Sequence, residues 1–84
     1  MESRWPMTKI KLIWDFRGPH AEKTAAHHVV HLEEYFQIEK ISQEHLGSTV
    51  LTDMHSIAHV VVNEPDLRKV RDALKPHRGE LFSN

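Results

Sequence analysis

The apolar residues of this chain change their spacing at Gly18, and no other feature constrains the fold as strongly. Residues 8–16 (TKIKLIWDF) alternate, with Ile13 as the one apolar side chain on the polar side, and a period of two predicts a half-buried strand. Pro19 suits the first position of a helix, where its missing N–H costs nothing. A helical spacing then predicts an amphipathic helix to residue 37, with its apolar stripe at Ala21, Ala25, Val29, Leu32 and Phe36.

The rest of the chain contains a second set of strands and a second helix. Residues 39–46 alternate weakly and predict a strand, and residues 47–53 resemble a turn. Residues 55–63 (HSIAHVVVN) are rich in β-branched side chains and predict a third strand. A second helix over 64–75 has a proline in its first turn and another directly after it. Residues 79–82 predict a short last strand.

Strand–helix–strand–strand–helix–strand is the element order of a ferredoxin-like fold. We expect one α+β domain over residues 1–84, a two-layer βαββαβ sandwich with residues 1–7 as a loose lead-in. Its four-stranded antiparallel sheet carries both helices on one face, and a right-handed crossover leaves room for the third strand between the first two. The expected core joins the apolar sides of strands and helices: Leu12, Trp14, Phe16, Val29, Leu32, Phe36, Val60, Val62, Val70 and Leu74.

Composition excludes several classes of function. Lys and Arg number 11 against 12 Asp and Glu, a net charge of −1, so the basic stripe of a nucleic-acid-binding protein is missing. The absence of cysteine excludes disulfides and zinc–thiolate sites and fits a reducing compartment. No apolar run approaches the roughly 20 residues of a membrane span, and Met1 to Met7 lack the apolar stretch of a signal peptide. We therefore expect a cytoplasmic protein without nucleic-acid or membrane partners.

The element order resembles that of ACT-type ligand-binding domains and of dimeric α/β-barrel proteins. Two stretches, DFRGPHAEKTAAHHVVHL (residues 15–32) and ALKPHR (residues 73–78), resemble small uncharacterised bacterial proteins of the same architecture. This resemblance implies the fold and attaches no activity to it. P-loop, G-x-G-x-x-G and G-x-S-x-G motifs are all missing from the sequence, so no cofactor is expected.

Eight histidines in so short a chain are the feature that most needs an explanation. The predicted topology brings the first strand's end, the central hairpin and the last loop to one end of the sheet. The candidate ligand-binding residues at this end are Arg17, His20, His55, His77 and Arg78, with Lys75 and Asp53 beside them. Arginines near free helix N–H groups suit a phosphate or carboxylate, whereas His20, His55, His77 and Asp53 suit zinc or nickel. Solvated loop residues are the third interpretation.

His27 and His31 form a second constellation, because residues four apart on a helix lie one above the other. Such a pair can chelate a metal, although a zinc hydrolase would carry Glu directly after the first histidine. On a helical wheel the pair lies about 140° or more from the core stripe. We therefore expect these to be ordinary exposed histidines and assign no metal site to them. His28 lies nearer the core edge and is expected to be a packed, hydrogen-bonded histidine.

The sheet face away from the helices would carry Ile13, Ile57 and Val61, an apolar patch that favours a homodimer. His59 lies on the same face. The leading hypothesis is therefore a small, dimeric, cytoplasmic ligand-binding or regulatory domain that accepts an acidic small molecule. The alternatives are an enzyme of dimeric α/β-barrel type, with His20, His55 or His59 as general base, and a metal-binding protein.

Overall fold

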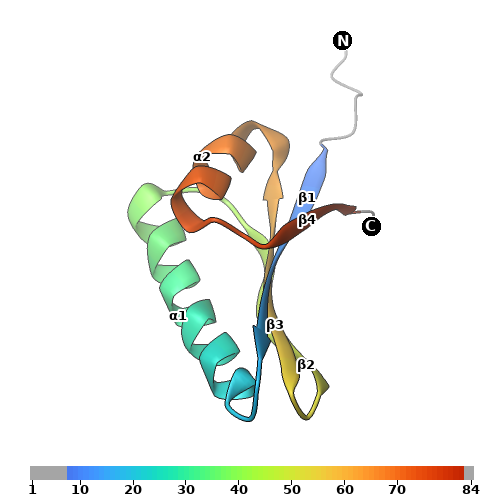
Figure 1. Ribbon diagram of the computed structural model, residues 1–84. Coiled ribbons are helices and arrows are strands. Elements are labelled where there is room, and N and C mark those ends of the chain that lie inside the picture. Colours follow the sequence, from blue (N-terminus) through green and yellow to red (C-terminus); the bar gives the residue numbers. More distant parts are fainter. Residues whose placement is uncertain (1–7, 83–84) are drawn as a thin grey trace.

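A computed structural model describes residues 8–82, and the lead-in expected over residues 1–7 lies outside them. The described chain is an α+β, ferredoxin-like fold with the predicted order of elements (Figure 1). Its helices and strands are β1 (Lys9–Arg17), α1 (Ala21–Glu39), β2 (Glu44–Thr52), β3 (His55–Asn63), α2 (Glu64–Leu74) and β4 (Arg78–Phe82).

The four strands form one sheet in the order β2-β3-β1-β4, and every neighbouring pair is antiparallel. As predicted, β3 lies between β1 and β2, and both helices lie on one face of the sheet (Figure 1). β1 pairs with β3 along its whole length, from Lys9 opposite Asn63 to Arg17 opposite His55. β4 covers only the first half of β1, from Lys9 to Ile13.

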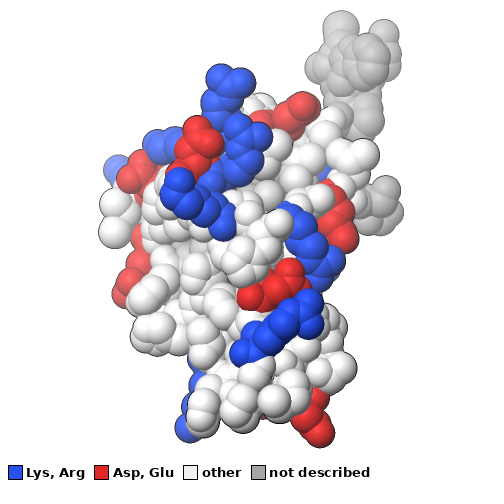
Figure 2. Space-filling model, in the orientation of Figure 1, with Lys and Arg blue, Asp and Glu red and all other residues white. Residues whose placement is uncertain are grey.

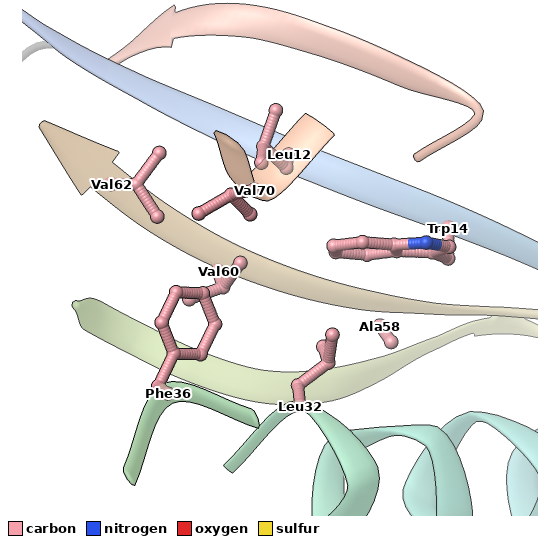
Figure 3. Close-up of a cluster of buried hydrophobic side chains, with 8 residues drawn as sticks. All are labelled: Leu12, Trp14, Leu32, Phe36, Ala58, Val60, Val62 and Val70. Carbon is pink, nitrogen blue, oxygen red and sulfur yellow. The ribbon is translucent and has the colours of Figure 1, made fainter. Parts of the chain in front are cut away.

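The core lies between the helices and the sheet (Figure 3) and contains seven of the ten side chains expected there, while Phe16, Val29 and Leu74 are partly buried against it. Leu12 and Trp14 of β1 meet Val60 and Val62 of β3, and all are at most 3% exposed. The Trp14 Nε1–H donates a hydrogen bond of 2.9 Å to the carbonyl of Leu74, so the buried indole is satisfied. This bond also ties the end of α2 to β1. The remaining members of the cluster are Leu32 and Phe36 of α1, Ala58 of β3 and Val70 of α2.

The β2–β3 hairpin differs from the prediction. The strand expected over 39–46 begins at Glu44 and runs to Thr52, through the segment expected to be a turn, and the turn lies at residues 53–54. Two irregularities in the β2–β3 pairing, between Glu44 and Gly47 and between Val50 and Thr52, interrupt the alternation that sequence analysis depends on. The bulge next to Gly47 places His45 at a φ of 53°.

The boundaries of α1 are also shifted. Pro19 precedes the helix rather than opening it, since His20 is the N-cap and Ala21 the first helical residue. At the other end the helix runs on to Glu39, and Lys40 ends it in the left-handed conformation with a φ of 56°, a common way to end a helix.

The open face of the sheet, opposite the helices, does not expose the apolar patch expected there. Ile13, Ile57 and Val61 are only 2%, 7% and 1% exposed. Polar side chains lie over this face: a 2.7 Å salt bridge from Lys9 Nζ to Glu44 Oε2 joins β1 to β2 across β3, at the level of Val61. The expectation of an exposed patch is therefore wrong, and the homodimer stays a prediction without this support.

Candidate functional site

The densest polar cluster of the described chain surrounds Asp15 on the open face. Arg78 of β4 donates to both carboxylate oxygens, from Nε to Oδ2 at 3.0 Å and from Nη2 to Oδ1 at 3.1 Å. Nε2 of His55, on β3, lies 2.8 Å from Oδ1. Three neighbouring strands thus contribute one residue each, and the Asp15 side chain is only 16% exposed.

The cluster keeps Asp15 ionised. The hydrogen bond from Arg78, helped by that from His55, lowers the pKa of Asp15 to about 2 against the opposing effect of burial. A carboxylate with so low a pKa is a poor general base at neutral pH. The bidentate contact also neutralises the charge of the Arg78 guanidinium, so a ligand anion would have to compete with Asp15 for it.

His77 joins the same cluster through the backbone. Its N–H donates to the carbonyl of Ile13 at 3.0 Å, and its Nδ1 accepts the Asp15 N–H at 2.8 Å. His77 therefore continues the hydrogen bonding of β1 beyond the point where β4 begins. Because Nδ1 is the acceptor, the neutral ring carries its proton on Nε2.

The other two predicted ligand residues lie apart from this cluster. Arg17 ends β1 and His20 caps α1, both are exposed, and no hydrogen bond or ion pair among residues 8–82 joins their side chains to His55, His77 or Arg78. The reason is a difference in length: α2 has 11 residues and α1 has 19, about 16 Å against 28 Å. The chain leaving α2 therefore meets β1 at Ile13 rather than at its end, and ligand binding by these five residues stays a prediction.

Two of the three histidines proposed as general bases, His59 and His55, are already engaged in hydrogen bonds. His59 donates from Nδ1 to the His45 carbonyl at 2.8 Å, and its Nε2 lies 3.3 Å from the Thr49 hydroxyl. Burial lowers the pKa of His59, so its neutral form fits these bonds. His55 is held by its hydrogen bond to Asp15. Residues 8–82 contain no group of three His, Asp or Glu side chains suited to a metal ion, so no histidine there has a third metal ligand beside it.

His28 packs against β1 but differs from its prediction in one respect. Its ring lies 4.9 Å from that of Trp14 and 5.5 Å from that of Phe16, centre to centre. Its Nε2 is buried without a hydrogen-bond partner among the described residues. Burial is the main cause that lowers the pKa of His28, and the nearby His31, His77 and His27 lower it further.

This environment predicts acid sensitivity of the fold. A histidine whose pKa is lower in the folded chain stabilises it fully above the unfolded pKa of about 6.5 and loses this effect as pH falls. We expect the melting temperature to fall between pH 7 and pH 5, and to fall less in His28→Phe, which keeps the aromatic contacts but cannot bind a proton. Calorimetry over this range tests the difference. If the melting temperature falls equally with pH in both proteins, His28 does not contribute to the acid sensitivity, which leaves His59 as the acid-sensitive group.

Sequence analysis missed a groove between α2 and β4. It measures about 400 Å³ and is lined by the apolar side chains of Ile10, Leu12, Leu67, Pro76 and Leu81. It forms because α2 packs on β3 and β1, which leaves β4 at the margin of the helix layer, with Leu81 78% exposed. The only sequence signal was this apolar residue on a short terminal strand.

Two further residues define the groove. Gly79 lies on its floor, where an added Cβ would stand 3.4 Å from Leu12 Cδ2 and 3.6 Å from Ile10 Cγ2, so any side chain there would enter the groove. Arg71 of α2 borders the groove, and among residues 8–82 its guanidinium makes one ion-pair contact, a long one of 3.6 Å with Asp72. Arg78 and Glu80 also border the groove, but the Arg78 guanidinium bonds to Asp15 on the open face.

The surface has no zone of a single charge in the view of Figure 2, where basic and acidic side chains alternate over α2 and along the sheet. Within residues 8–82, neither helix has the length and apolar character to cross a bilayer. Comparisons with protein-family models, with curated proteins and with solved structures give no match to this chain.

Proposed function

We propose that this chain is a small binding domain that takes up an acidic small molecule with an apolar body in the groove between α2 and β4. The observation that carries this proposal is the groove itself, because its 400 Å³ lies within the range of small-molecule sites and its apolar lining with few polar groups is typical of them. The cysteine-free composition favours a reducing compartment, so we propose the cytoplasm as its location.

The lining indicates the chemistry of the ligand. An apolar body placed against Leu12, Leu67 and Leu81 removes apolar surface from water, worth about 25 cal/mol for each Å². A carboxylate at the rim would pair with Arg71, whose planar fork matches two oxygens. The proposal keeps the acidic ligand expected from the sequence and moves its carboxylate from Arg78, which Asp15 occupies, to Arg71.

A matched pair of probes, octanoate and octanamide, tests both parts of this proposal. At ten times its Kd, octanoate should raise the free energy of unfolding by about 1.4 kcal/mol, and the melting temperature by about 6–11 °C. Octanamide, of the same length but uncharged, should give a smaller rise. Differential scanning fluorimetry measures both, and amide chemical shifts of residues 78–82 report whether the probe lies in the groove.

Two variants separate shape from charge. Gly79→Leu should abolish the response to both probes, because its side chain fills the groove. Arg71→Gln should make the responses to acid and amide equal, whereas Arg68→Gln, an exposed arginine of the same helix outside the groove, should behave as the unmodified chain. An undiminished octanoate response in Gly79→Leu would place binding elsewhere and contradict the proposal.

A further inference from the structure

The outward face of α1 carries a continuous exposed stripe that the fold does not use. Successive turns of the helix contribute Lys23, His27, Val30, His31, Glu34 and Ile38, all exposed. At 100° per residue these fall within one sector, opposite the buried Ala25 and Leu32. The three strands β1, β2 and β3 contact α1 on its other side, and the outward face is open (Figure 1).

His27 and His31 are arranged as a bidentate ligand in the middle of this stripe. Their rings lie 4.4 Å apart, centre to centre, in an edge-to-face arrangement. Neither ring takes part in a hydrogen bond or ion pair within residues 8–82. One chain therefore offers two imidazoles and no third ligand among the described residues, which leaves a zinc ion half coordinated.

We propose that a divalent cation of the zinc class binds at this pair and completes its coordination with His27 and His31 of a second copy of the chain. Four neutral imidazoles at about 2.0–2.1 Å satisfy tetrahedral zinc, and a twofold axis through the ion supplies them with identical surfaces. The site is incomplete in a single chain, so binding of the ion and dimerisation are one event.

The residues around the pair suit a second copy in the antiparallel orientation. A twofold axis at the histidines brings Lys23 of one copy near Glu34 of the other, and the reverse contact forms at the opposite end. Neither side chain forms an ion pair within the described residues. Val30 and Ile38, 49% and 75% exposed, add apolar surface that two helices can bury against each other.

Protons compete with the metal, because only neutral imidazole coordinates. Acid should therefore weaken zinc-dependent dimerisation.

Sedimentation velocity of the untagged full chain, with zinc chloride as the probe, tests the inference. In EDTA the 9.8 kDa chain should sediment as a monomer, and half an equivalent of zinc should convert it to a dimer that EDTA reverses. The variant His27→Ala with His31→Ala should remain folded and monomeric at the same zinc concentration. His20→Ala with His45→Ala, which removes two exposed histidines elsewhere, should dimerise as before.

Charge exchange tests the orientation of the two helices. Lys23→Glu should raise the zinc concentration needed for half-dimerisation several-fold, and adding Glu34→Lys should restore it. The inference is overturned if saturating zinc leaves the mass unchanged, if zinc binds one ion per chain without association, or if the dimer persists in His27→Ala with His31→Ala.

Discussion

Introducing two charges on the open face of the sheet, with Ile57→Glu and Val61→Lys in one chain, is expected to unfold the domain. If these residues formed an exposed dimer surface, the same change would give a folded monomer. They are 7% and 1% exposed within a single chain, however, so each new charge would be buried. The cost is several kcal/mol for each ion, and together this approaches the whole stability of a small domain, about 5–15 kcal/mol.

Circular dichroism and urea unfolding measure this effect, and α1 supplies a matched control. Val30→Lys with Ile38→Glu places the same two charges at positions 49% and 75% exposed, where substitutions change the free energy of unfolding by about 0.5 kcal/mol or less. A cooperative unfolding transition near that of the unmodified chain in the Ile57 and Val61 variant would show that the open face is not a second core.

Replacing the carboxylate of Asp15 is expected to produce the second large loss. Asp15→Ala removes the acceptor for Arg78 and His55 at once, and hydrogen bonds that involve a charged group are worth about 1.5–3 kcal/mol. We expect a decrease of that size in the free energy of unfolding at pH 7. The pKa of about 2 lies below the ordinary value, so the contribution of Asp15 is complete above pH 4 and is lost as pH falls through 2.

Urea titrations at pH 7 and pH 2 test both statements. The difference between Asp15→Ala and the unmodified chain should be large at pH 7 and smaller at pH 2. Asp53→Asn serves as the control, since Asp53 lies exposed in the hairpin turn without an ion pair among the described residues. If Asp15→Ala lowers the free energy of unfolding by the same amount at both pH values, the ionised carboxylate is not what stabilises the sheet.

The fold was predictable because its central strands carry clear local signals, an alternation of apolar residues in β1 and a run of β-branched residues in β3. β3 has the predicted bounds, His55 to Asn63, since an internal strand must place apolar residues on both faces. The predicted bounds of β2 were wrong because it is an edge strand with two irregularities in its pairing. The alternation of apolar and polar residues therefore never extends over enough residues to identify the strand. Helix ends moved by one or two residues, as expected where capping rather than packing decides.

The candidate site was predictable only in part, because it depends on where elements end relative to one another. The sequence identified His55, His77 and Arg78, but their meeting point is Asp15. The groove follows from the shortness of β4 and α2. No local pattern of residues encodes how two short elements leave a gap over the sheet.

The hydrogen bonds of His77 decide which residues this position can tolerate. A side chain, rather than a fourth-strand peptide group, accepts the Asp15 N–H, so the sheet edge here depends on residue type in a way that backbone pairing does not. An asparagine at position 77 would keep an acceptor for the Asp15 N–H, whereas a leucine would leave that N–H unpaired. A protonated imidazole would place a second N–H donor opposite it. The hydrogen bonding of β1 past Ile13 thus depends on one side chain, and a substitution at residue 77 can break it without any change in the course of the backbone.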